Sequence, residues 1–183
     1  LERVLREERT HHAPPETMPT LDYFAGGNMR AVGRRGPSVD ALGEILHATD
    51  RFPRLVVVTV NFDTLIESVS GDVIEVFATE DEFASCPAYL ASYLTSGGRV
   101  PVLKLHGSID RPESIVANVD QTMPGLSTLR RAALESIRAA GAQRVPWLYV
   151  GYSMRDLDLR PLLAQADFAE RLEETWVSPF PDS

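Results

Sequence analysis

The chain has 183 residues, of which 44% are hydrophobic and 24% are charged, as is usual for a globular domain. Its 26 Asp and Glu residues outnumber 18 Lys and Arg residues, and the formal charge of −8 argues against binding to nucleic acid or to an anionic membrane surface. A single cysteine excludes an internal disulfide and a zinc site made of cysteine pairs, so we expect no metal. We find neither a membrane-spanning apolar run nor a secretory signal, and we therefore expect a cytoplasmic protein.

The first part of the chain is dense in proline and glycine, which predicts loops. We interpret residues 1–37 as an irregular lead-in or flap and residues 38–183 as one folded domain. Because the chain begins with Leu1 and stops on a Pro-Phe-Pro-Asp-Ser sequence, we expect it to be a fragment of a longer protein.

From residue 38 onward, helical patterns alternate with apolar runs. Ser38 can cap a helix, and the β-branched run at residues 55–60 predicts a strand buried on both faces, as in a parallel sheet covered by helices. A helical pattern follows over residues 64–69. Further strands are expected at residues 73–77, 100–105, 114–119 and 147–150, and further helices at residues 80–94, from Ser127 to Gly141, and after Asp158 with Pro161 in the first turn. This alternation predicts an α/β fold with a mainly parallel sheet.

Three of the apolar strands end in polar turns. Asn61 and Asp63 follow the first, His106 and Ser108 follow the second, and Ser153 follows the third. Ligands of open α/β sheets bind outside the carboxyl ends of the strands, so we expect these groups to lie along one edge. Taken singly, Asn61 or Asp63 can cap a helix, a lone histidine is more often structural, and a strand-to-helix turn is common. Their conjunction favours a ligand site.

The residues of these turns resemble the successive motifs of the sirtuin superfamily. The resemblance rests on residues 59–63 (TVNFD), 104–109 (KLHGSI) and 150–156 (VGYSMRD), and it covers about residues 38–163. It is closest to the bacterial sirtuin-like branch found in anti-phage defence proteins. It implies a Rossmann-like three-layer sandwich that takes NAD as its substrate.

The resemblance also implies roles for individual residues. Asn61, Asp63 and His106 are the expected catalytic residues, with His106 as the base and the other two around the nicotinamide ribose. Asp158 is interpreted only as a carboxylate at a helix start. The expected NAD-binding residues are Thr59, Asn61, Asp63, Gly107, Ser108, Gly151, Tyr152, Ser153 and Asp156.

Four departures from the family pattern refine this expectation. Deacetylating sirtuins carry glutamine where Val60 stands, usually threonine where Tyr152 stands, and a four-cysteine zinc module that a chain with only Cys86 cannot build. These three differences point away from peptide deacetylation. The family also opens with a strand and a glycine-rich phosphate loop; residues 25–28 are glycine-rich but follow a poor strand, so we expect the first βα unit to be missing.

The expected function is hydrolysis of NAD to nicotinamide and ADP-ribose, as the effector domain of a bacterial anti-phage defence protein. A fused sensor domain or a homo-oligomer would regulate it. The first alternative is a non-catalytic module that binds NAD or ADP-ribose. A further alternative is an NAD-dependent protein deacylase or ADP-ribosyltransferase, which the missing zinc module disfavours.

Overall fold

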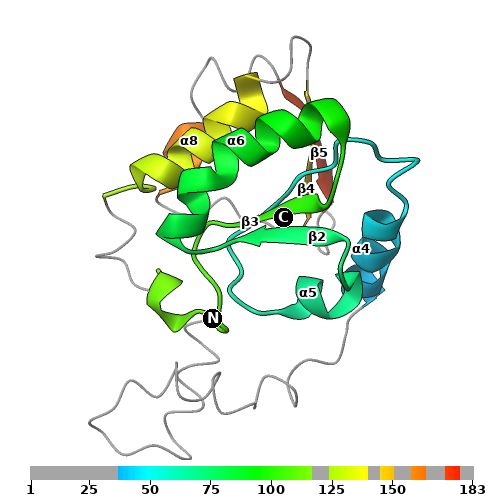
Figure 1. The fold of residues 1–183 in the computed structure, drawn as a ribbon, viewed down its shortest axis with the longest axis horizontal. Coiled ribbons are helices and arrows are strands. Elements are labelled where there is room, and N and C mark those ends of the chain that lie inside the picture. The colour runs from blue at the N-terminus through cyan, green and yellow to red at the C-terminus, as the bar shows by residue number, and fades with distance from the viewer. Residues whose placement is uncertain (1–36, 117–123, 140–144, 151–157, 164–171, 178–183) are drawn as a thin grey trace, which may run out of the picture.

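Helices alternate with parallel strands in the computed structural model, which describes residues 37–116, 124–139, 145–150, 158–163 and 172–177 (Figure 1). The elements are α4 (Pro37–His47), β1 (Val57–Thr59), α5 (Leu65–Ser70), β2 (Ile74–Phe77), α6 (Glu80–Ser96), β3 (Val100–Lys104), the 3₁₀ helix η2 (Pro112–Ser114), α8 (Thr128–Ala139), β4 (Val145–Val150), α9 (Arg160–Leu163) and β5 (Leu172–Val177).

The sheet that organises the fold has three strands, and β3 lies between β1 and β2. Both pairings are parallel, with Val58 opposite Leu103 and Val76 opposite Val102. A second pair, β4 and β5, is also parallel. The α/β fold predicted from the alternation of helices and strands is therefore confirmed, and it is Rossmann-like. Parallel pairing also puts the carboxyl ends of β1 and β3 at the same edge.

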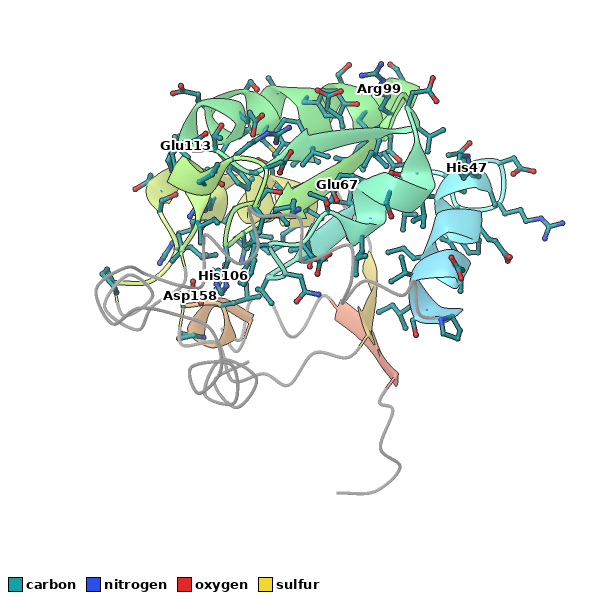
Figure 2. All side chains as sticks on the ribbon, turned by 90° about the horizontal axis from the view of Figure 1, so that it is seen from below. His47, Glu67, Arg99, His106, Glu113 and Asp158 are labelled. Carbon is teal, nitrogen blue, oxygen red and sulfur yellow. The ribbon has the colours of Figure 1, made fainter. Side chains whose placement is uncertain are left out.

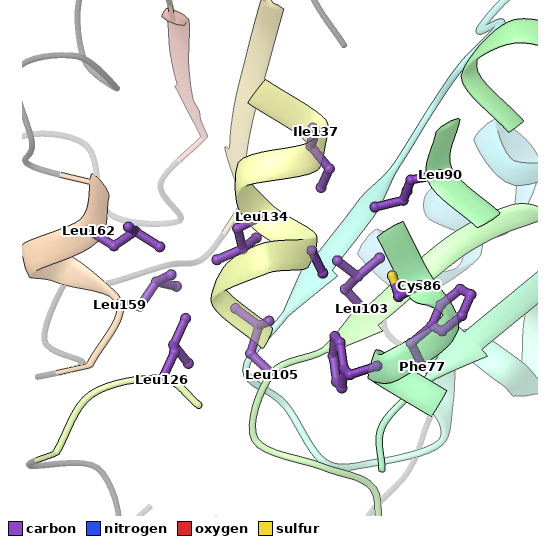
Figure 3. Close-up of a cluster of buried hydrophobic side chains, with 12 residues drawn as sticks. Phe77, Cys86, Leu90, Leu103, Leu105, Leu126, Leu134, Ile137, Leu159 and Leu162 are labelled. Carbon is purple, nitrogen blue, oxygen red and sulfur yellow. The ribbon is translucent and has the colours of Figure 1, made fainter. Parts of the chain in front are cut away.

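Side chains of β3 alternate between two hydrophobic clusters, one on each face of the sheet. Val102 packs with Leu46 of α4 on one face, and Leu103 packs with Leu134 of α8 on the other. Helices α4 and α5 thus cover one face, whereas α6 and α8 cover the other (Figure 1). Figure 3 shows the larger cluster, which lies beneath α6 and α8. It extends to Leu159, just before α9, and to Leu162 within α9. The fold is a three-layer arrangement.

Two strand predictions need correction. The run at residues 55–60 forms a strand only over Val57–Thr59, and its side chains are half-buried on both sides of the sheet. Within the described residues β1 pairs with β3 alone, so it lies at an edge of the sheet and is less covered than the fully buried β3. The strand expected at residues 114–119 is wrong over residues 114–116, because Ser114 ends the 3₁₀ helix η2, which begins at Pro112, and the next two residues form no strand. Residues 117–119 lie outside the described residues.

Smaller differences have local causes. Helix α4 already includes Pro37, so Ser38 lies in the first turn and does not cap it; proline suits the first helical position. Leu148 of β4, expected in a buried strand, is 56% exposed. Strand β5 was not predicted. In the described part of the chain, no helix is both long and apolar enough to cross a membrane.

Candidate functional site

Two of the three polar turns lie side by side at the carboxyl edge of the sheet. The loop after β1 and the turn after β3 are joined by two backbone hydrogen bonds. Leu105 N donates to Thr59 O at 2.9 Å, and Ile109 N donates to Phe62 O at 2.8 Å. These bonds continue the parallel pairing beyond the strands, so the expectation that the two turns meet at one edge is confirmed.

The loop after β1 exposes an amide side chain and begins a helix. Asn61 is exposed, and its backbone N–H donates to Thr59 Oγ1 at 3.0 Å. One carboxylate oxygen of Asp63 accepts a hydrogen bond from Leu65 N at 3.0 Å, at the start of α5. Asp63 therefore acts as a helix-start residue. Within the described residues, the exposed side chain of Asn61 makes no such capping contact.

The turn after β3 is held tightly against η2. Gly107 has a φ of +86°, and a Cβ there would lie only 2.2 Å from Ser114 O, so no other residue fits this position without displacing the backbone. Ser108 is fully buried, and its N–H donates to Ser114 Oγ at 2.9 Å. Both residues hold the turn that carries His106.

His106 is buried and paired with a carboxylate from a distant part of the chain. Its Nε2 lies 3.0 Å from Asp158 Oδ2, 52 positions later, just before α9. The side chains are 11% and 2% exposed. Figure 2 shows the two side chains pointing toward one another.

The environment of Asp158 decides the direction of this hydrogen bond. Burial by itself would raise the pKa of the Asp158 carboxyl, but the hydrogen bond and charge of His106 act against it. Together with the N–H groups of Asp158 and Leu159 they hold that pKa below its ordinary value. Asp158 is thus a carboxylate that can only accept, so His106 Nε2 donates the proton.

Asp158 is the partner that sequence reasoning missed, since it was interpreted only as a helix-start carboxylate. Lys104 was quoted in the second motif but given no role, and it is buried beside Asp63, Glu67 and Ser108. A lysine inside an otherwise apolar run was a signal that could have found it, because a buried ammonium needs partners. No comparable signal tied Asp158 to His106.

The remaining predicted positions belong to the third turn. Gly151, Tyr152, Ser153 and Asp156 lie outside the described residues. Cys86 is buried, and burial raises the pKa of its thiol to about 12, so it stays a neutral core side chain. Among the residues that the structure describes, no three His, Cys, Asp or Glu side chains form a group able to hold a metal ion.

Comparison with known families places these turns in one domain. The family model of the SIR2-like domain matches residues 55–182, which include both turns and Asp158. The chain belongs to the SIR2-like domain family. SIR2-like domains use NAD, so this SIR2-like domain is associated with NAD-related chemistry. No curated protein and no solved structure matches the chain significantly.

Proposed function

We propose that this SIR2-like domain hydrolyses NAD to nicotinamide and ADP-ribose. The observation that carries the proposal is the buried His106–Asp158 pair at the carboxyl edge of a parallel sheet, beside the exposed Asn61. This edge is where open α/β sheets bind their ligands. A histidine whose ring N–H donates a hydrogen bond to a carboxylate has the arrangement of an oriented general base.

In the proposed reaction, the bond between C1′ of the ribose and the pyridinium nitrogen breaks. Its electron pair goes to the nitrogen, and nicotinamide leaves as a neutral molecule. The oxygen of a water molecule forms the new bond to C1′, and the proton of that water goes to a base on the protein. The transition state resembles an oxocarbenium ion, as in glycoside hydrolysis.

The side chains divide this work between them. Because Nε2 of His106 donates to Asp158, Nδ1 is the ring nitrogen with a lone pair that can accept the proton. Imidazole is suited to this role near neutral pH. Asn61 can hold the attacking water or a ribose hydroxyl, since its amide both donates and accepts. Asp63 adds negative potential near the developing cation.

Other predicted binding residues support the site more indirectly. We assign Gly107 and Ser108 to the shape of the turn, and Thr59 to the conformation of the loop that presents Asn61, on the basis of their contacts within the protein. We propose Gly151, Tyr152, Ser153 and Asp156 for the adenosine side of NAD, on the resemblance of their motif.

The products of an incubation with NAD test this function. We expect the purified protein to release nicotinamide and free ADP-ribose in equal amounts, as measured by liquid chromatography. Binding of NAD without any product would instead indicate a non-catalytic module. Nicotinamide release that requires an acetylated peptide, or ADP-ribose that becomes attached to protein, would indicate a deacylase or a transferase. Absence of both binding and products would contradict an NAD function.

We further propose that the domain acts in the cytoplasm of a bacterium as the effector of an anti-phage defence protein, on the basis of the sequence resemblance. Unregulated loss of NAD would harm the host, so such an enzyme needs control by oligomerisation or by a fused sensor domain. Light scattering together with the NAD assay over a range of protein concentrations tests this. Activity per protomer that is independent of assembly would argue against control by oligomerisation.

A further inference from the structure

Lys104 is the last residue of β3, and its side chain is 1% exposed. It belongs to the face of β3 that carries Val100 and Val102, which pack in the cluster beneath α4 and α5. Lys104 is thus the polar end of an apolar stripe in the central strand. An ammonium group is costly to bury unless each of its three donors finds a partner.

The three partners of the ammonium come from three separate segments. Lys104 Nζ donates to the backbone O of Asp63 in the loop after β1, to Glu67 Oε1 of α5 at 2.8 Å, and to Ser108 Oγ in the turn after β3 at 2.6 Å. Asp63 and Ser108 belong to the two loops that present Asn61 and His106. Figure 2 shows Glu67 projecting from α5.

This ion pair is poorly explained by stability alone. Among the residues that the structure describes, the buried atom Glu67 Oε2 has no hydrogen-bond partner, so the carboxylate is only half satisfied. Replacing a buried ion pair by apolar side chains of similar volume is often neutral or stabilising. What the charged pair provides, and an apolar pair would not, is directional bonds from one group to both loops.

We infer that Lys104 is a positioning residue that fixes the Asn61 loop and the His106 turn in one arrangement. This inference rests on the proposed NAD hydrolysis for its catalytic consequence. The ammonium does not touch substrate, since all three of its donors are used within the protein. It acts through the backbone O of Asp63 and through Ser108, and it supplements the bond from Ile109 N to Phe62 O.

The test compares three variants with the wild-type protein. Lys104→Met leaves the half-buried Glu67 without its cation and will lower the melting temperature. Lys104→Met combined with Glu67→Met removes both charges, and we expect it to recover most of the wild-type melting temperature. The matched control is Tyr93→Phe, which removes a partly buried hydrogen bond to Leu55 O, before the amino end of β1 and away from both loops.

The double variant separates positioning from stability. We expect its kcat for nicotinamide release to fall about 100-fold because the catalytic groups lose their relative placement, with KM changing by less than about threefold. Tyr93→Phe will keep the wild-type kcat. We also expect amide hydrogen exchange at Ile109 to be faster in the double variant than in wild type or Tyr93→Phe, because this N–H bridges the two loops.

Either of two results would overturn the inference: wild-type kcat in the folded double variant, or unchanged exchange at Ile109. The exchange measurement needs no substrate. If the wild-type protein releases no nicotinamide, the proposed function fails, and the exchange result alone still decides whether Lys104 fixes the two loops.

Discussion

A carboxylate behind His106 determines which of its ring nitrogens can act as a base. The short contact between Nε2 and Asp158 Oδ2 holds the ring orientation and keeps the proton on Nε2. The lowered pKa of Asp158 keeps the carboxylate ionised at neutral pH, so this arrangement persists there.

Asp158→Asn tests this role. The amide can present its N–H₂ group to the ring and so favour the wrong tautomer, with nearly the same shape. We expect kcat for nicotinamide release to fall by about 100- to 10,000-fold, with a much smaller change in KM. Steady-state kinetics on the folded variant measure this. Asp72→Asn, at an exposed position after α5, is the control that should keep full activity. Equal activity of the two variants would show that Asp158 has no part in orienting the base.

The sequence predicted individual site residues unevenly. Asn61 and His106 could be placed at the sheet edge because each directly follows an apolar run, and the structure brings their loops together. Asp158 could not be matched to His106, because a pair separated by 52 positions depends on how the layers pack. The position of Lys104 in an apolar run indicates that it is buried. The identity of its three hydrogen-bond partners depends on the fold and could not be predicted.

At the scale of elements, the start of α6 is fixed by a capping box next to the site. Thr79 Oγ1 accepts from Glu82 N at 3.3 Å, and Glu82 Oε2 accepts from Thr79 N and Ala78 N, both at 2.9 Å. Arg111, in the segment that follows the His106 turn, also donates to Glu82 at 3.1 Å. One carboxylate therefore connects α6 to the loop region after β3.

These contacts make the stability of the fold depend on pH. Burial alone would raise the pKa of Glu82, but the N–H groups of Thr79 and Ala78 and the charge of Arg111 outweigh it and lower that pKa. A carboxyl group whose pKa is lower in the folded state than in the unfolded state stabilises the fold fully at pH values above its unfolded-state pKa. That contribution is lost as the pH falls through the folded-state value.

We therefore expect Glu82→Gln to be less stable than wild type near pH 7 and the difference to shrink below about pH 4. Urea unfolding at a series of pH values measures this difference in the free energy of unfolding. Glu44→Gln, at an exposed position on α4, should show no such pH-dependent difference. If the difference in the free energy of unfolding between wild type and Glu82→Gln stays constant down to low pH, the lowered pKa of Glu82 is contradicted.

Elements were predictable where local chemistry decides them. The apolar runs gave β2 and β3, and Ser127 accepts a hydrogen bond from Arg130 N at 3.3 Å at the start of α8, as a capping residue should. The 3₁₀ helix η2 was missed because Ser114 bonds to Arg111 O and Ser108 N, contacts specific to this turn. The length and half-buried state of β1 depend on its place in the sheet.

At the scale of the whole molecule, one parallel sheet with helices on both faces explains why distant motifs converge. Strands β1 and β3 run in the same direction, so the loops that follow them meet at one edge. The core beneath α6 and α8 extends to Leu159 (Figure 3). This packing places the preceding residue, Asp158, against His106. The two core clusters follow from the alternation of side chains along β3, whereas the meeting of the two loops follows from the parallel pairing of β3 with β1.

The measurement that tests this account most directly is nicotinamide release from NAD by His106→Ala, with Asn61→Ala beside it. His47→Ala is the matched control, because His47 is exposed on α4, away from the site (Figure 2). With circular dichroism showing all three variants folded, we predict that His106→Ala and Asn61→Ala abolish release and that His47→Ala retains the wild-type rate. Release at the wild-type rate by folded His106→Ala would contradict the central claim that this histidine is the catalytic base.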